Sequence, residues 1–79
     1  MMLTPSQCRA ARALIAWSQS DLCDAAKVGR ATLANFEAEK STPYERTLRD
    51  IRAALEDAGV IFIEQNGNGP GVRLRDRKE

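Results

Sequence analysis

The stretch SQSDLCDAAKVGRATLANFE, residues 18–37, predicts two short helices joined by a tight turn. Ser18 and Asp21 have the spacing of a capping box, in which each side chain accepts a hydrogen bond from the other residue's backbone N–H, so a helix is expected to begin there. The apolar pattern breaks at residues 27–29, and a second helix is expected from residue 30 to about residue 38. Their inner faces are apolar or small: Leu22, Ala25 and Ala26 in the first, Leu33 and Phe36 in the second.

A further helix is expected on each side of this pair. Thr4 and Pro5 resemble the N-cap and first residue of a helix that runs to about Ala16. Its apolar face carries Cys8, Ala11, Leu14 and Ile15, while Gln7, Arg9 and Arg12 fall on other faces. After the polar loop 40–43, apolar residues at helical spacing between Leu48 and Ala58 trace a fourth helix that stops at Gly59.

The C-terminal part has the pattern of a β-hairpin. Residues 60–63 form a β-branched and aromatic run, residues 66–71 are rich in glycine and asparagine, and residues 72–75 alternate apolar with basic side chains. The predicted fold is therefore mainly α, with four helices in residues 1–59 followed by a C-terminal β-hairpin and tail in residues 60–79. A chain of 79 residues is expected to form these as one compact unit.

Composition argues against several classes of protein. The chain has no histidine, and no serine, cysteine or lysine has an evident activating partner, so we expect no enzyme activity, no cofactor and no metal site. Cys8 and Cys23 lack metal-ligand spacing and are interpreted as small buried thiols in preference to a disulfide. No apolar run approaches the length of a membrane span and no secretory signal is present, so a cytoplasmic location is expected.

The helix order and residues 18–37 resemble the Xre family of helix-turn-helix proteins, the phage repressor and Cro-like regulators. The resemblance covers roughly residues 7–59. The matching positions are Ser18, Gln19, Leu22, Ala26, Val28, Thr32, Leu33 and Glu37. It implies a lambda-repressor-like DNA-binding domain and a transcriptional regulator, a repressor or autoregulator, that reads a pseudo-palindromic operator in the major groove as a homodimer.

The resemblance also implies particular roles and shows two departures. Arg12 and Glu37 occupy the places of a pair that fixes the recognition helix; the alternative is two independent surface charges. Lys27 stands where the family usually has glycine and must accept a left-handed conformation, at a cost of about 1 kcal/mol. Gly29 stands where the family usually has serine or threonine, and it lacks a hydroxyl for a phosphate.

Contacts with double-stranded DNA fall into two sets. The base-reading candidates lie at the start of the recognition helix: Arg30, Ala31, Thr32 and Asn35. The phosphate-binding candidates are Gln19, Lys27, Gly29, Lys40, Ser41, Thr42 and Tyr44. Arg46, Arg49 and Arg52 of the fourth helix, interleaved with carboxylates, are interpreted as a solvated face.

A net charge of only +1 means that a single copy would neutralise few phosphates, so dimerisation is expected. The predicted dimer interface consists of the apolar hairpin residues Val60, Ile61, Phe62, Ile63, Val72 and Leu74. Two hairpins paired across a two-fold axis would set the recognition helices roughly 34 Å apart. Two alternatives stay open: the hairpin folds back on its own helices, or the chain is an antitoxin-like protein-interaction module with secondary DNA binding. Residues 59–79 are too few to enclose a small molecule, so no such ligand is expected.

Overall fold

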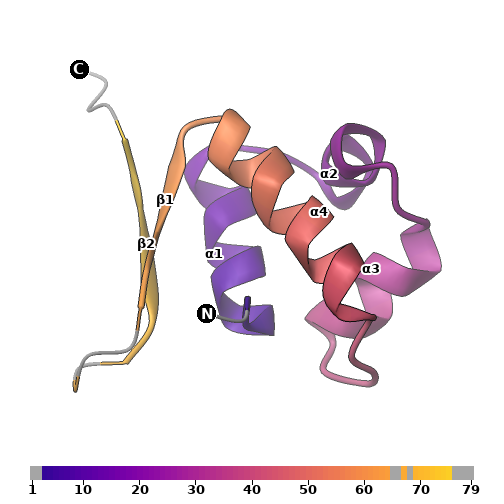
Figure 1. Cartoon of the computed structure of the whole chain (residues 1–79). Coiled ribbons are helices and arrows are strands. Elements are labelled where there is room, and N and C mark those ends of the chain that lie inside the picture. Colours follow the sequence, from indigo (N-terminus) through magenta and orange to yellow (C-terminus); the bar gives the residue numbers. More distant parts are fainter. Residues whose placement is uncertain (1–2, 65–66, 68, 76–79) are drawn as a thin grey trace.

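Helices occupy most of the chain, and a short β-hairpin follows them (Figure 1). The computed structural model describes residues 3–64, 67 and 69–75. The elements in chain order are α1 (Pro5–Leu14), α2 (Gln19–Ala26), α3 (Arg30–Glu37), α4 (Glu45–Asp57), β1 (Val60–Ile63) and β2 (Gly71–Leu74). The predicted mainly α fold, with four helices and a C-terminal hairpin, is confirmed at this level.

Capping boxes begin both α1 and α2. The Thr4 hydroxyl accepts a hydrogen bond from the backbone N–H of Gln7, and the Gln7 side chain accepts one from the backbone N–H of Thr4, both at 3.1 Å. Ser18 and Asp21 repeat the arrangement at 3.0 and 2.9 Å. Each box satisfies N–H groups that have no partner inside the helix, which fixes where the helix starts.

The end of α1 differs from the prediction. The helix ends at Leu14 and does not reach Ala16, because Ala16 has a left-handed φ of 57°. The backbone N–H of Trp17 then bonds to the carbonyl of Arg12 at 2.9 Å, which closes the helix and turns the chain toward α2.

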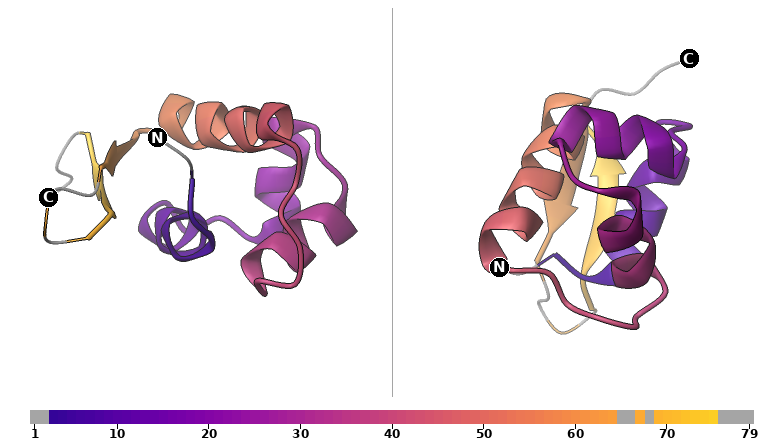
Figure 2. Two further views of the ribbon diagram at one scale, coloured as in Figure 1. Left: turned by 60° about the horizontal axis from the view of Figure 1, so that its bottom comes forward. Right: turned by 90° about the vertical axis from the view of Figure 1, so that its right-hand side faces the viewer.

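The core lies between the helices and the inner face of the hairpin. Its largest fully buried side chains come from all four helices and β1: Cys8, Leu22, Leu33, Ile51, Leu55 and Val60. Cys8 and Cys23 are free and buried, as expected. Figure 2 shows that the hairpin lies beside α1 and α4, while α2 and α3 lie toward the other end of the molecule.

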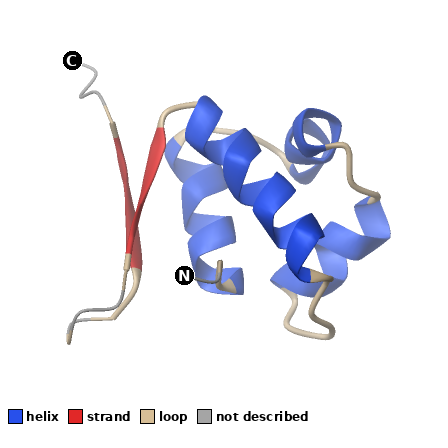
Figure 3. Ribbon diagram, viewed as in Figure 1, coloured by secondary structure: helices blue, strands red, loops and turns tan. Residues whose placement is uncertain are grey.

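The hairpin is antiparallel, with Val60 opposite Leu74 and Phe62 opposite Val72 (Figure 3). Strand alternation turns Val60 and Phe62 into the core, and Val72 packs against it. The prediction of these three side chains as dimer interface is therefore wrong, because they cover the chain's own helices. Of the remaining predicted set, Ile61 and Ile63 lie on the opposite face, and Leu74 is half-buried on the inner side.

The predicted turn at residues 66–71 lies partly outside the described residues, as do residues 76–79 of the predicted tail. Gly67 and Gly69 are described, and both have positive φ, 99° and 88°. Glycine adopts this conformation without the steric cost that other residues meet, as the turn chemistry predicted.

The burial of Gln7 is a third difference from the prediction. Helical spacing places it on an outer face of α1, but the residue is only 3% exposed. Its Nε2 donates to the carbonyl oxygens of Gly71 at 3.1 Å and Ile63 at 3.4 Å. The hairpin covers this face of α1, and Gln7 connects the start of the helix to the end of the hairpin nearest the turn.

Within the ranges that the structure describes, no helix combines the length and apolar character needed to cross a membrane.

Candidate nucleic-acid interface

A three-residue turn sets the angle between α2 and α3. Lys27 ends α2 in the left-handed conformation, with φ 60° and ψ 46°. Val28 is half-buried against the core, and its backbone N–H bonds to the Cys23 carbonyl at 3.1 Å. Gly29 is the N-cap of α3 and provides no side-chain hydrogen bond. The turn therefore forms with the two departures from the family pattern in place.

A buried carboxylate fixes the C-terminal end of α3. Glu37 is 4% exposed and accepts hydrogen bonds from three other side chains. Arg12 contacts both oxygens, with Nε 2.8 Å from Oε2 and Nη2 2.7 Å from Oε1. Gln19 Nε2 donates to Oε1 and the Cys8 thiol donates to Oε2, each at 3.0 Å. The pair of Arg12 and Glu37 implied by the resemblance is therefore present. Glu37 and its three partners, Arg12, Gln19 and Cys8, are called the Glu37 cluster below.

Two further contacts involve the arginines of α1, one with the segment before α2 and one with the end of α3. Arg12 Nη1 donates to the carbonyl of Trp17 at 3.0 Å. The Arg9 guanidinium donates to the backbone carbonyl of Glu37. Cations at the C-terminus of a helix interact favourably with its free carbonyl groups, so Arg9 holds the end of α3 through its backbone, whereas Arg12 holds it through the Glu37 carboxylate.

The electrostatics of the Glu37 cluster favour an ionised carboxylate. Burial disfavours the charge, but hydrogen bonds from Arg12, Gln19 and Cys8 outweigh it and hold the pKa of Glu37 below its ordinary value. Burial and the bond to Glu37 raise the pKa of the Cys8 thiol, which therefore remains a protonated donor. The hydrogen bond to Glu37 also raises the pKa of Arg12.

The outer side of α3 carries the predicted base-reading residues. Arg30, Ala31, Thr32 and Asn35 are all exposed, whereas Leu33 and Phe36 are buried. Eight residues of helix thus divide into an inner side that packs on the core and an outer side open to a ligand. The structure brings these four candidates together on one short helix.

Arg30 has a partner that the sequence did not predict. Its Nη1 donates to the hydroxyl of Ser20, in the first turn of α2, at 2.5 Å. Both residues are exposed, so the contact lies on the surface and joins the first residue of α3 to the first turn of α2. Their separation of ten positions carries no periodic signal, because the contact depends on the angle of the intervening turn.

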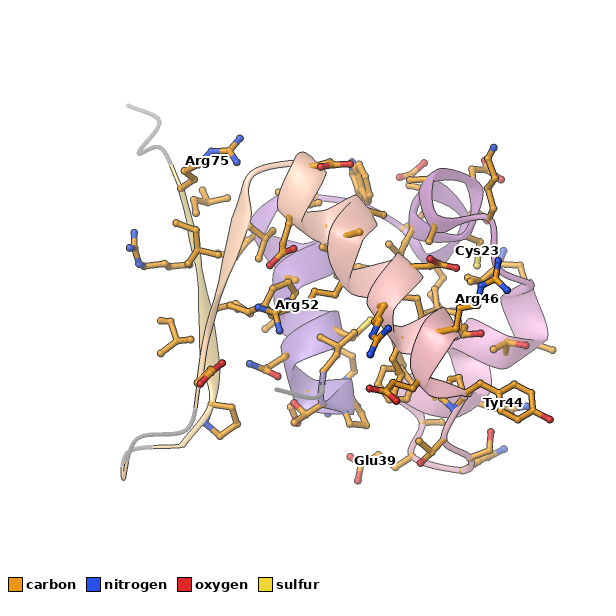
Figure 4. All side chains as sticks on the ribbon, viewed as in Figure 1. Cys23, Glu39, Tyr44, Arg46, Arg52 and Arg75 are labelled. Atoms are coloured by element: carbon orange, nitrogen blue, oxygen red, sulfur yellow. The ribbon has the colours of Figure 1, made fainter. Side chains whose placement is uncertain are left out.

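A hollow separates α3 from the loop before α4. Ala31, Thr32 and Asn35 line one side, residues 41–44 line the other, and Thr47 closes it. Tyr44 is 87% exposed and extends from the start of α4 (Figure 4). Three predicted phosphate-binding residues, Ser41, Thr42 and Tyr44, therefore lie beside the predicted base-reading residues.

The other predicted phosphate-binding residues have different surroundings. Lys27 and Lys40 are exposed, and Gly29 offers only its backbone. Gln19 is half-buried at the start of α2, and one of its side-chain N–H groups is used by Glu37. The amide nitrogen of glutamine carries two donors, so Gln19 has a second N–H group beside the one that Glu37 accepts.

Two arginines of α4 form local ion pairs, but only Arg46 and Arg49 fit the predicted solvated face, because Arg52 is half-buried over the ring of Phe62. Arg49 pairs with Glu45 at 3.0 Å and Arg52 pairs with Glu56 at 2.9 Å, each one helical turn apart. Arg46 follows Tyr44 by two positions and is exposed (Figure 4).

Comparison with known proteins adds no family assignment: no protein-family model matches the chain, and no curated protein matches it. Over the described ranges, no three histidine, cysteine, aspartate or glutamate side chains are grouped so that they could hold a metal ion.

Proposed function

We propose that this chain is a sequence-specific DNA-binding transcriptional regulator of the Xre helix-turn-helix family, with a lambda-repressor-like fold. In this proposal it acts in the cytoplasm as a repressor or autoregulator. The observation that carries the proposal is that α3 is held in place at its C-terminal end and exposes polar side chains along the preceding turns. Buried Glu37 fixes the C-terminal end of the helix against α1 and α2, while the helix exposes an arginine in its first turn and an asparagine in its second, Arg30 and Asn35.

The exposed side of α3 has the chemistry needed to read base edges. Arginine presents two parallel donors that match the O6 and N7 atoms of guanine, and asparagine presents the donor and acceptor that match adenine. The methyl groups of Ala31 and Thr32 suit contact with the methyl group of thymine. Docking of the helix N-terminus into the major groove would bring these residues to the bases first.

The surroundings of α3 supply groups for the DNA backbone. The free N–H groups at the start of α2 favour an anion, and the hydroxyls of residues 41–44 stand on the other side of α3. These contacts would orient the protein on the duplex without specifying sequence. Because net charge is only +1, we propose a homodimer that doubles the phosphate contacts and reads a pseudo-palindrome.

The test is selection of bound sequences from a random duplex pool at low salt. Wild type is compared with Arg30→Ala and Asn35→Ala, and Arg49→Ala serves as the control because Arg49 is an exposed arginine on α4. We expect a palindrome whose base preferences relax at one different position per half-site in each α3 variant, by about 1–3 kcal/mol, and an unchanged palindrome in the control. No enrichment by wild type would reject sequence-specific recognition.

The outer face of the hairpin favours a second candidate, a protein-interaction module. Ile63 is 37% exposed and Ile61 is half-buried on a face that no element of the described chain covers. An antitoxin-like protein would use this face to hold a different chain. Purified protein that requires a partner to remain in solution, and enriches no DNA sequence, would favour this candidate over the first.

A further inference from the structure

The two edges of the hairpin differ in charge. β1 consists of Val60, Ile61, Phe62 and Ile63 and carries no charged side chain, although the exposed Glu64 follows it. β2 contains Arg73, and Arg75 follows it directly. Charged side chains on an edge strand oppose pairing with an identical strand, whereas an uncharged β-branched strand favours it. The β1 edge is therefore the one suited to pair with a second copy of the chain.

The hydrogen-bond pattern of the hairpin shows which groups of β1 reach this edge. The backbone N–H of Arg75 bonds to the carbonyl of Gly59 at 2.7 Å, and these two residues continue the register of the strands. Bonded pairs alternate with non-bonded pairs in an antiparallel ladder. The N–H and C=O groups of Ile61 and Ile63 therefore point toward β2, and those of Val60 and Phe62 point toward the free edge.

The side chains agree with a paired β1 edge. On the outer face, Ile61 stands opposite Arg73 in the hairpin, and Ile63 is the more exposed of the two isoleucines. Two hairpins joined at β1 would bring the isoleucines of both copies together at the centre of the sheet and leave the arginines at its two outer edges. Cross-strand pairs of β-branched residues stabilise a sheet by about 0.2–1 kcal/mol each.

On the inner face of the hairpin, the side chain of Phe62 near this edge is already covered by a residue of α4. The guanidinium of Arg52 lies over the ring of Phe62, 5.2 Å from its centroid (Figure 4). Pairing at β1 therefore leaves the core packing of Phe62 in place and uses only backbone groups and the outer isoleucines.

We propose that two copies of this chain associate through antiparallel pairing of β1 with β1, which forms a four-stranded sheet in the order β2-β1-β1-β2. This inference rests on the dimer of the proposed function and specifies its interface. The backbone groups of Val60 and Phe62 that point to the free edge must form hydrogen bonds with the same groups of the second copy. This condition leaves two registers that keep the isoleucines at the centre of the sheet. Either Ile61 stands opposite Ile61 of the second copy, or Ile61 stands opposite Ile63 of the second copy.

Strand pairing of this length buries less area than a standard interface, so the association is expected to be weak, with a dissociation constant on the order of micromolar. Sedimentation equilibrium of the full chain without DNA should show a mass that rises from 8.7 kDa toward twice that value with concentration. Ile61→Lys should weaken the association at least tenfold. The matched control is Leu14→Lys, because Leu14 is an apolar side chain of α1 that is 41% exposed, and this variant should associate like wild type.

Cysteine cross-linking identifies the edge directly. The native thiols of Cys8 and Cys23 are buried, so an introduced surface thiol should react first under oxidised glutathione. Opposed odd-numbered residues of the two β1 strands form non-bonded pairs with Cα atoms about 4.5 Å apart, within the range of a disulfide. We expect a covalent dimer from Ile61→Cys alone or from Ile61→Cys mixed with Ile63→Cys, and none from Arg73→Cys. Circular dichroism confirms that each variant is folded.

The proposal would be overturned if the chain stayed monomeric at a protein concentration 100-fold above the expected dissociation constant. It would also be overturned by a dimer that cross-links through Arg73→Cys and not through β1. The outcome is independent of DNA recognition. Cross-linking through β1 without any enriched DNA sequence would reject the proposed function alone, whereas an enriched palindrome without cross-linking at β1 would reject the β1 interface alone.

Discussion

Replacing Arg12 with methionine leaves the Glu37 carboxylate buried without its cation. The Arg12 side chain is 19% exposed, so its contacts with Glu37 at 2.7 and 2.8 Å are largely shielded from water. Removing one partner of a buried ion pair costs about 3–5 kcal/mol. Gln19 and Cys8 still donate to the carboxylate, so we expect a loss near the lower end, about 3 kcal/mol, in the free energy of unfolding at pH 7. At about 4–8 °C per kcal/mol, the midpoint of thermal unfolding should fall by roughly 12–24 °C.

The size of this loss should depend on pH. In wild type the pKa of Glu37 is lowered in the folded state, so its contribution to stability is present above the carboxyl's unfolded pKa and is lost as pH falls through the folded pKa. Without Arg12, burial should raise the folded pKa of Glu37 above the unfolded one, and the variant should lose stability as pH rises. The difference between the two proteins should therefore be greatest at pH 7 and smallest near pH 4.

Urea unfolding provides the measurement, followed through the fluorescence of Trp17, the single tryptophan. Arg49→Met is the matched control, because its partner Glu45 is exposed and surface pairs contribute at most about 1 kcal/mol. A loss below about 1 kcal/mol for Arg12→Met, or one that is equal at pH 4 and pH 7, would refute the assignment of a buried, charge-dependent pair.

Three other changes test separate contacts. Ser20→Ala removes the acceptor that holds Arg30, and we expect the base preference at the Arg30 position to relax roughly 2–10-fold in a quantitative DNA selection, with affinity for random DNA unchanged within about twofold. Lys27→Gly should stabilise the fold by about 1 kcal/mol in urea unfolding, since glycine adopts the left-handed conformation without strain, and should reduce the salt dependence of DNA binding by about one phosphate contact. Gln7→Met removes two hydrogen bonds to the hairpin and the capping-box bond from the Thr4 N–H, should cost about 2–3 kcal/mol, and should speed hydrogen exchange in both strands; unchanged exchange would contradict the role of Gln7 in holding the hairpin.

Local signals predicted the helices because each one is encoded within a few residues. Thr4 with Pro5 and the capping box at Ser18 marked two helix starts, and the structure contains both. The end of α1 was missed because Ala16 has no intrinsic preference for a left-handed φ. Its conformation is imposed by the bond between Trp17 and Arg12, a contact that periodicity does not describe.

The hairpin shows a different limit of sequence reasoning. Its strands were predictable from β-branched residues and turn chemistry, but the direction of each face was not. Val60 and Ile61 are equally apolar, and only the packing of the hairpin on α1 and α4 turns the first inward and the second outward. The burial of Gln7 has the same origin, because the sheet that covers it comes from residues more than fifty positions away.

In the candidate site, too, some features could be predicted from the sequence and others depend on the packing of the helices. The pairing of Arg12 with Glu37 followed from the family resemblance, and the exposure of Arg30 and Asn35 followed from helical spacing. The contributions of Cys8 and Gln19 to the carboxylate could not be predicted, because they require the distances between three helices. The hydrogen bond from the Cys8 thiol to Glu37 could not be predicted, because the position of Cys8 in the sequence is explained equally well by a small residue in the core.

The position of α3 depends on contacts outside itself. A helix of eight residues is marginal in isolation, so its stability and its direction must come from the elements it packs against. Leu33 and Phe36 supply apolar packing, which tolerates small rotations, whereas the paired contacts of Arg12 with both oxygens of Glu37 define an orientation. Base reading requires such an orientation, because a guanidinium and an amide must meet particular base edges at the same time. The Glu37 cluster thus connects the folding of the chain to the recognition that we propose for it.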